Sequence, residues 1–231
     1  MRSDKLTLPQ YFSSSVGKKY LMAASGLVLS LFVIGHLVGN LQIFLGAEAI
    51  NRYGELLKSF PELLWPVRIF LLAMILLHIA TSTQLTLEAR AARPVAYSEK
   101  TYTKASLASR TMFISGLLIF SFVIYHLLHF TFLRVHPEYS NLIDMKGRHD
   151  VYSMMVRSFQ QPGISAAYIV AMFCLCFHLS HGLSSMFQSL GFNSERSRPC
   201  LSQAGAAVAW AIFLGYISIP VACLMGWVNL P

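Results

Sequence analysis

Residues 25–37 read SGLVLSLFVIGHL, and residues 115–127 read SGLLIFSFVIYHL. The two stretches lie 90 positions apart and share eight of thirteen residues, with His36 opposite His126. Both belong to apolar runs that are long enough to cross a bilayer as helices. The repeat therefore predicts two equivalent membrane-spanning helices, each of which carries one histidine at the same position.

The composition of the whole chain is that of a membrane protein. Of its 231 residues, 55% are hydrophobic and 12% are charged, whereas a soluble domain carries about 25% charged residues. A membrane-spanning helix needs about 20 apolar residues, and five runs reach that length: 20–46, 63–87, 111–133, 164–190 and 205–228. We therefore expect an all-α membrane protein with five transmembrane helices, in which residues 1–231 form a single membrane-spanning domain.

The net charge of +8 is distributed as a membrane topology predicts. If the N-terminus is cytoplasmic, the inner segments 1–19, 88–110 and 191–204 hold eleven Lys and Arg residues, and the outer loops hold six. Cytoplasmic loops of membrane proteins carry the excess of Lys and Arg, so the count favours a cytoplasmic N-terminus and an outer C-terminus. Because topology explains the positive charge, the charge does not indicate a nucleic-acid partner.

Six of the eight histidines lie inside the expected spans. Ionisable residues inside membrane helices are costly and indicate a function by default. One lies near the middle of each of the first four spans: His36, His78, His126 and His178. The first and third helices run outward and the second and fourth run inward, so helix direction pairs His36 with His126 toward the outside, about 25 Å from the inner flank. His78 and His178 form the corresponding pair toward the inside.

Two imidazoles that face each other across a helical bundle are suitable ligands for haem iron. Bundles build cofactor sites from side chains on facing helices. Ligation by two histidines leaves the iron with no open position, so such iron carries electrons and does not activate oxygen. Gly35, Gly39 and Gly182 are close to these histidines in sequence and could leave room for a flat ring, and ordinary helix packing explains small residues equally well.

Two further histidines leave the ligand choice partly open. His129 follows His126 by three residues, and His181 follows His178 by three residues, so each lies on nearly the same helix face as its neighbour. The repeat selects His126, because the position opposite His129 is a glycine. No such argument decides between His178 and His181.

Zinc binding and proton-coupled transport are competing uses for histidines in a membrane. Zinc prefers tetrahedral sites, often with cysteine or carboxylate ligands, and a proton-coupled transporter is expected to place carboxylates inside its spans. No Asp or Glu lies inside an expected span, which argues against both. The sequence has no C-x-x-C-H motif for covalent haem attachment and no glycine-rich loop for FAD, NAD or ATP.

Several of these stretches resemble a known family. They are SSVGKKYLMAASGLVLSLFVIGHLVGNLQIFLG (14–46), RIFLLAMILLHIATS (68–82), FSFVIYHLLHFTF (120–132), HLSHG (178–182) and FQSLG (187–191). They are similar to the first four helices of the diheme cytochrome b that forms the membrane anchor subunit of succinate dehydrogenase and fumarate reductase. The resemblance covers most of the chain.

The resemblance implies a five-helix, haem-binding bundle with one ligand on each of the first four helices. Carried over to this chain, the ligands are His36, His78, His126 and His178, which decides for His178 over His181. It implies two haems b: an inner haem on His78 and His178, which faces the iron–sulfur subunit, and an outer haem on His36 and His126.

The resemblance also implies the partners and the reaction. A separate flavoprotein subunit would oxidise succinate or reduce fumarate, and a separate iron–sulfur subunit would pass the electrons. This chain would bind both on the cytoplasmic side and exchange electrons with a quinone, expected to be menaquinone, in the lipid of the bacterial cytoplasmic (inner) membrane. Lys18, Lys19, Arg90 and Arg110 are the candidate inner contacts to haem propionates or partner subunits. A dimer of the whole complex remains open.

The quinone site is less defined by the resemblance. Some fumarate reductases of the family use an acidic residue near the outer haem, for which Glu55 and Glu62 are the candidates. Some carry a carboxylate just before the ligand of the fourth helix, but here that stretch is CLCFHLS (174–180), and the missing acid favours succinate oxidation. The alternatives are the fumarate reductase direction, a diheme cytochrome b of another quinone-linked dehydrogenase, and a histidine-bearing transporter without haem.

Overall fold

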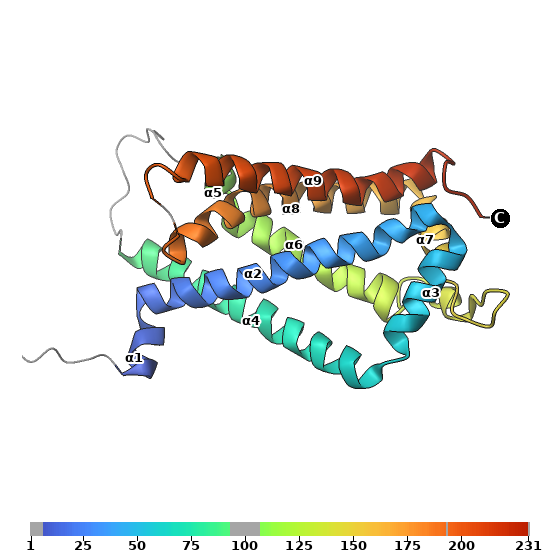
Figure 1. The fold of residues 1–231 in the computed structure, drawn as a ribbon, viewed down its shortest axis with the longest axis horizontal. Coiled ribbons are helices and arrows are strands. Elements are labelled where there is room, and N and C mark those ends of the chain that lie inside the picture. The colour runs from blue at the N-terminus through green and yellow to red at the C-terminus, as the bar shows by residue number, and fades with distance from the viewer. Residues whose placement is uncertain (1–6, 93–106, 193, 231) are drawn as a thin grey trace, which may run out of the picture.

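The computed structural model describes residues 7–92, 107–192 and 194–230 (Figure 1). Within these residues the chain is helical, with one isolated β-bridge between Ile143 and His149. Five helical spans are long and apolar enough to cross a membrane, which confirms the predicted all-α membrane bundle. The spans are α2 (Ser15–Asn40) with its 3₁₀ extension η1 (Leu41–Leu45), α4 (Pro61–Ala91), α6 (Met112–His126) with its π-helical extension η2 (Leu127–Thr131), α8 (Pro162–Ser189) and α9 (Arg198–Leu224).

The ends of these helices follow local sequence signals. The Ser14 side chain caps α2 by accepting a hydrogen bond from the N–H of Gly17 at 3.1 Å. Helices α4, α8 and α9 each have a proline in the first turn, where a missing N–H costs nothing. The predicted fifth span, 205–228, was displaced toward the C-terminus. Helix α9 begins earlier, at Arg198 with Pro199 in its first turn, and Gly226, with φ +73°, lies just beyond its end.

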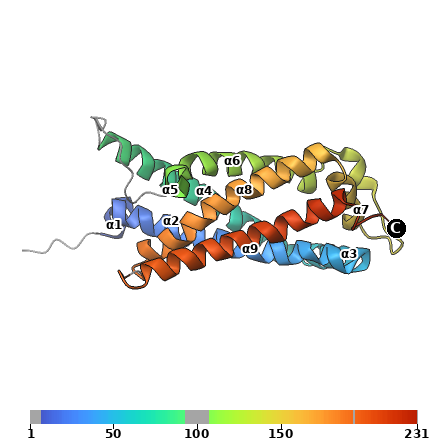
Figure 2. The same ribbon diagram turned by 90° about the horizontal axis from the view of Figure 1, so that it is seen from above.

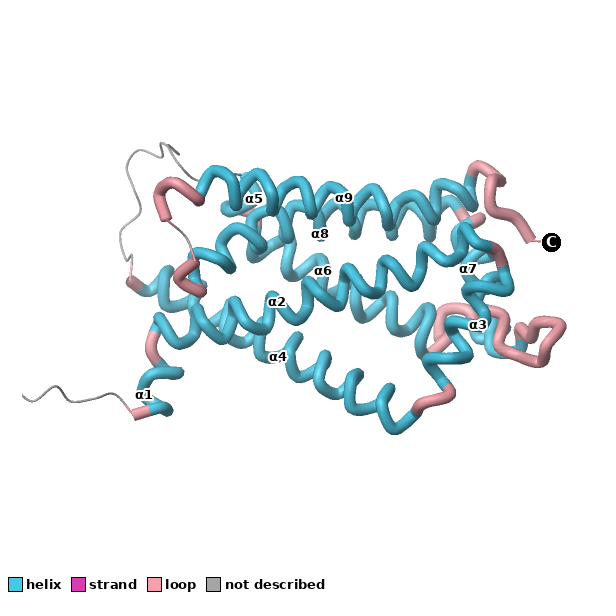
Figure 3. Tube along the Cα trace, in the orientation of Figure 1, coloured by secondary structure: helices cyan, strands magenta, loops and turns pink. Residues whose placement is uncertain are grey.

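The long helices run roughly along the long axis of the molecule (Figures 1 and 2). Helix α9 packs along α8, and α2 packs against both α4 and α8, while α6 packs against α8. The short helices α1 (Leu8–Ser13) and α5 (Leu107–Arg110) lie at one end of the bundle. Helices α3 (Ala47–Lys58) and α7 (Val151–Phe159) lie at the other end. Figure 3 shows that the loops also gather at the two ends.

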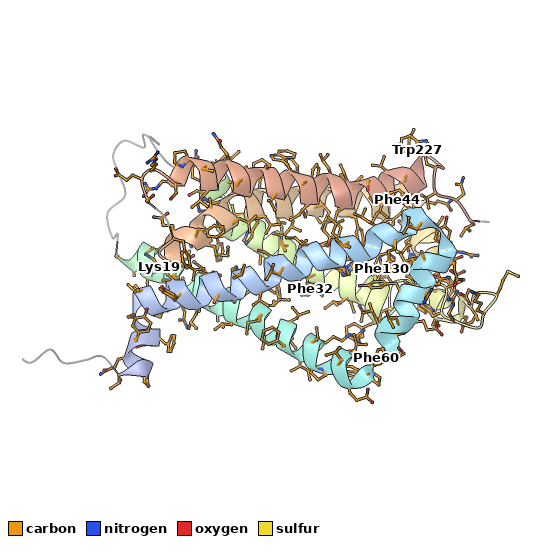
Figure 4. The ribbon with its side chains drawn as sticks, viewed as in Figure 1. Lys19, Phe32, Phe44, Phe60, Phe130 and Trp227 are labelled. Atoms are coloured by element: carbon orange, nitrogen blue, oxygen red, sulfur yellow. The ribbon has the colours of Figure 1, made fainter. Side chains whose placement is uncertain are left out.

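Those cations expected on the inside that the structure describes lie at the end that carries α1. Lys19 lies at this end, whereas Phe44 and Trp227 lie at the opposite end (Figure 4). Arg90 is in the last turn of α4, and Arg110 ends α5. We call this end the inner end and the end with α3 and α7 the outer end; the cytoplasmic placement of the inner end stays a prediction. Five of the inner cations lie outside the described residues: Arg2, Lys5, Arg93, Lys100 and Lys104.

The outer end contains helices that hydropathy did not predict. We call α3, η3 (Pro137–Asn141), residues 142–150 and α7 the outer cap. Asn51, which is 2% exposed, donates to the Asp150 carboxylate at 3.0 Å and accepts from the N–H of Tyr152 at 2.9 Å. Arg148 pairs with Glu48 at 2.7 Å. These contacts join α3 to the start of α7, so the outer segments form one folded layer over the bundle.

Candidate functional site

The structure brings the four mid-span histidines together in two pairs. The ring centres of His36 on α2 and His126 on α6 are 5.8 Å apart, and we call these residues the outer pair. The ring centres of His78 on α4 and His178 on α8 are 6.3 Å apart, and we call these residues the inner pair. These are the pairs that helix direction predicts, and each joins a helix of the first half of the chain to one of the second half.

Glycine contacts show how far apart the two pairs lie. A Cβ atom added at Gly26 would lie 3.2 Å from Cε1 of His78, and one added at Gly116 would lie 3.5 Å from Cε1 of His178. The inner pair is therefore level with these two glycines. The outer pair follows ten residues later on both helices (36 − 26 and 126 − 116). At about 1.5 Å per residue, the two pairs lie about 15 Å apart along the bundle.

The separation of the rings fits two imidazoles on opposite sides of one metal ion. A histidine nitrogen bonds a metal at about 2.0–2.1 Å and lies about 1.2 Å from its own ring centre, so two such ligands have ring centres about 6.4 Å apart. The inner pair meets this value at 6.3 Å, and the outer pair is slightly closer at 5.8 Å.

Hydrogen bonds determine which ring nitrogen of the inner histidines carries the proton. Nδ1 of His78 lies 3.1 Å from the carbonyl oxygen of Met22, and a carbonyl only accepts, so Nδ1 is the donor. The Ser25 oxygen lies 3.3 Å from the same nitrogen. Nδ1 of His178 lies 3.2 Å from the Ser115 oxygen, whose own proton goes to a backbone carbonyl one turn earlier. In both neutral rings Nε2 therefore keeps its lone pair for a metal.

A second chain of hydrogen bonds fixes the proton on His126. Ser158 donates to the carbonyl of Met154 at 2.8 Å and therefore accepts from Nε2 of His129 at 3.1 Å. Nδ1 of His129 then accepts from the Tyr168 hydroxyl at 3.0 Å. The Tyr168 oxygen is left to accept from Nδ1 of His126 at 3.4 Å. His126 thus also keeps Nε2 free.

This network separates the roles of His126 and His129. His129 is fully buried, and both of its ring nitrogens are engaged in hydrogen bonds. It lies in the π-helical turn η2, a distortion that is frequent at functional sites. The free nitrogen is on His126, the residue that the internal repeat favours.

Two tyrosines beside the outer pair were missed by the sequence interpretation. Tyr168 on α8 holds His126 and His129, as described above. Tyr216 on α9 has its ring centre 6.4 Å from that of His36, and its hydroxyl donates to a backbone carbonyl of α2 at 2.8 Å. A tyrosine in an apolar span is a signal, because its hydroxyl needs a partner, but the sequence does not show which helix it faces.

The three glycines that could make room for a flat ring differ in the space beside them. A Cβ atom added at Gly35 or at Gly182 would meet nothing within 4 Å. One added at Gly39 would lie 2.7 Å from the ring of Tyr53. Gly35 and Gly182 therefore border open space, whereas Gly39 permits close packing of α3 on α2.

The four candidate inner contacts all lie at the inner end of the bundle, and two of them link helices. Lys18 forms an ion pair with Glu88 on α4. The guanidinium of Arg90 lies 5.5 Å from the ring centre of Phe113 on α6. Lys19 lies in the first turns of α2, and Arg110 is the last residue of α5. Their roles toward a cofactor or a partner subunit stay predictions.

The donor set suits a metal that brings most of its own ligands. In the described part of the chain, no group of three or more His, Cys, Asp or Glu side chains could hold a metal ion. Each histidine pair supplies two nitrogens, and the equatorial positions of such an ion must be filled by something other than protein. A haem would meet this requirement, because its macrocycle would supply the other nitrogens and each histidine pair would supply the two protein ligands.

The geometry defines a class of protein: a multi-pass helical membrane protein with two pairs of facing histidines inside its bundle. The family model of the succinate dehydrogenase/fumarate reductase transmembrane subunit matches residues 89–217, which is more than half of the chain and includes His126 and His178. The chain belongs to this family. It is a membrane subunit of an oxidoreductase complex and associates with flavoprotein and iron–sulfur subunits. Neither a curated protein nor a solved structure matches it.

Proposed function

We propose that this chain is the diheme cytochrome b membrane anchor of a succinate:quinone oxidoreductase and that it relays electrons between the iron–sulfur subunit and membrane quinone. In this proposal His78 and His178 hold an inner haem b, and His36 and His126 hold an outer haem b. The observation that supports it is the pair of facing imidazoles, found twice at ring separations of 6.3 and 5.8 Å.

The residues of the chain have defined tasks in this relay. Each haem, when bound, would supply an iron that gains and loses one electron. His78, His126 and His178 present an unprotonated Nε2, because their Nδ1 atoms donate to fixed acceptors. Two histidines on each iron would leave no open coordination position, which would suit electron transfer and would exclude oxygen binding. The two pairs lie about 15 Å apart along the bundle, so the two haems would form successive steps between its inner and outer ends.

The proposal includes a direction and a location. The N-terminus is cytoplasmic, so the inner end, with Lys19 and Arg110, faces the iron–sulfur subunit in a bacterial cytoplasmic membrane. Succinate oxidation with menaquinone as acceptor is the proposed reaction. Of the two acidic candidates for the quinone site, Glu55 borders a cavity of about 330 Å³ in the outer cap together with Lys58 and His149, whereas Glu62 lies in the first turn of α4.

Haem quantification on the purified complex tests the proposal. We expect b-type bands in the dithionite-reduced minus oxidised spectrum and two haems for each copy of this chain. Replacing any one of the four ligands by alanine should remove one haem or change its spin state. His181→Gln is the matched control, because it changes a histidine on α8 one turn from His178 and should leave both haems in place.

The possible results separate the alternatives. A well-folded complex without haem would overturn the cytochrome interpretation and favour the histidine-bearing transporter. One haem per chain, lost only when one of the two pairs is changed, would limit the site to that pair. Loss of haem in His181→Gln but not in His178→Ala would move the ligand by one turn. Succinate-driven quinone reduction and quinol-driven fumarate reduction, measured on the same preparation, decide the direction.

A further inference from the structure

The internal repeat extends toward the inner end beyond the two histidines that first reveal it. Three residues of α2 recur 90 positions later in α6: Met22, Ser25 and Gly26 reappear as Met112, Ser115 and Gly116. In the structure, the α2 set contacts the imidazole of His78. The α6 set contacts the imidazole of His178 in the same way. The repeat therefore supports one inner histidine in each half of the chain.

The two serines occupy equivalent positions beside their histidines. Their oxygens lie 3.3 Å from Nδ1 of His78 and 3.2 Å from Nδ1 of His178, and the serines are 1% and 6% exposed. Ser25 donates its proton to a backbone carbonyl of α2 at 2.7 Å, and Ser115 donates to one of α6 at 3.1 Å. With their protons committed, both serine oxygens accept from the rings.

Other serines on the same helices show that contact with a histidine ring is not a general property of serines in apolar helices. Ser30 on α2 donates to the carbonyl of Gly26 at 2.8 Å, and Ser121 on α6 donates to that of Leu117 at 3.0 Å. Both satisfy their hydroxyls within their own helices, as serines in helices often do. Ser25 and Ser115 do the same and in addition accept from a histidine of another helix.

We infer that Ser25 and Ser115 are positioning residues that act together with the backbone carbonyls of their own helices to hold the tautomer and orientation of the two inner ligands, and that they thereby lower the midpoint potential of the inner haem and slow its loss. The inference rests on the proposed function. An acceptor at Nδ1–H raises the basicity of the coordinating nitrogen, and a more basic ligand stabilises the more highly charged, oxidised iron. Hydrogen bonding of this kind is one of the means by which a protein sets the potential of a haem.

The test uses the whole complex with Ser25→Ala or Ser115→Ala in this chain. The controls are Ser30→Ala and Ser121→Ala, which remove a serine hydroxyl from the same helices without touching a histidine. Ser25→Thr and Ser115→Thr keep an oxygen at the same place and should restore the wild-type behaviour. The readouts are haem per chain, the two midpoint potentials from a redox titration, the low-temperature EPR signals that report ring orientation, and the rate of haem transfer to excess apomyoglobin.

We expect each alanine variant to raise one midpoint potential, to leave the other unchanged and to speed the loss of one haem by about 10-fold, since removing such a partner typically weakens a metal site 10–100-fold. The affected haem should be the one that His78→Ala removes. Potentials and loss rates that match those of the two control variants would overturn the inference and leave the haem assignment intact. A wild-type complex without haem would instead refute the proposed function. If an alanine variant does not assemble, the comparison of threonine with wild type still applies: a threonine variant with an altered inner potential or altered ring orientation contradicts the role of the hydroxyl oxygen.

Discussion

One added methyl group beneath each inner histidine should affect the two histidines unequally. A Cβ atom at position 26 would lie 3.2 Å from Cε1 of His78, and one at position 116 would lie 3.5 Å from Cε1 of His178. Carbon atoms in favourable contact are about 3.5–4.0 Å apart. Gly116→Ala therefore fits the space that exists, whereas Gly26→Ala requires the ring of His78 to retreat by at least about 0.3 Å.

The retreat of His78 has a calculable effect on its hydrogen bonds. Nδ1 is held by bonds of 3.1 Å to Met22 and 3.3 Å to Ser25. Lengthening them by about 0.3 Å gives about 3.4–3.6 Å, which is at or beyond the range of an N–H···O hydrogen bond. Because lost partners of a ligating histidine cost 10–100-fold in metal affinity, we expect Gly26→Ala to speed the loss of the inner haem by about 10-fold and Gly116→Ala to change it less than about 2-fold.

Haem transfer from the purified complex to excess apomyoglobin measures both rates in one assay. Alanine is a better helix former than glycine by about 1 kcal/mol, so neither variant should fail to fold because of its helix. Gly163→Ala, in the first turn of α8, is the control, since a Cβ atom there would meet nothing within 4 Å. Equal loss of haem from Gly26→Ala and Gly116→Ala, or faster loss from Gly116→Ala, would refute the reasoning.

Three further predictions concern the outer half of the molecule. Tyr168→Phe removes the hydroxyl that donates to His129 at 3.0 Å. We expect the free energy of unfolding in detergent to fall by about 0.6–1.7 kcal/mol, the range for hydrogen bonds between membrane helices. An unchanged free energy of unfolding would show that this bond does not stabilise the fold. The hydrogen bond from Arg148 holds the pKa of Glu48 at about 2 instead of 4.5. The stabilisation by this ion pair is therefore complete above about pH 4.5 and is lost as the pH falls toward 2. Hydrogen exchange of residues 142–150, corrected for intrinsic rates, should rise as the pH falls through that window, and a flat profile would contradict this. Asn51→Leu removes the buried amide that joins α3 to α7, and it should make local opening of the outer cap about 1–3 kcal/mol easier by hydrogen exchange while leaving the spans unchanged; unchanged exchange would count against the amide's role.

The sequence predicts the bundle well because hydropathy is a property of each segment alone. All five spans follow from apolar length, and the helix directions are sufficient to place His36 beside His126 and His78 beside His178. The predicted bounds of the fifth span lay too far toward the C-terminus. Polar residues in the first turns of α9 interrupt the apolar pattern there, although the helix already begins at Arg198 with Pro199 in its first turn.

The outer cap and the supports of the histidines could not be predicted in this way. The hydrogen bond from Asn51 to Asp150 joins residues 99 positions apart, and no periodic pattern points to it. The role of His129 depends on Tyr168 and Ser158, which reach it from two other helices. Such contacts depend on the rotation of each helix about its own axis, and a uniformly apolar span leaves that rotation undefined in the sequence.

The internal repeat is clear in α2 and α6 and weak in α4 and α8, and the structure offers a physical reason. Residues 71–80 and 171–180, aligned on His78 and His178, share only the histidine. Helices α4 and α8 agree only in the residue that enters the inner pair. Helix α8 also supports the outer pair through Tyr168, which has no counterpart in α4. Helices α2 and α6 each carry an outer histidine and also support an inner one with a serine, a glycine and a backbone carbonyl ten to fourteen residues earlier. Two tasks at fixed spacing restrict more positions of a helix than one task does. The repeat is therefore visible in α2 and α6, the two helices that serve both histidine pairs in the same way.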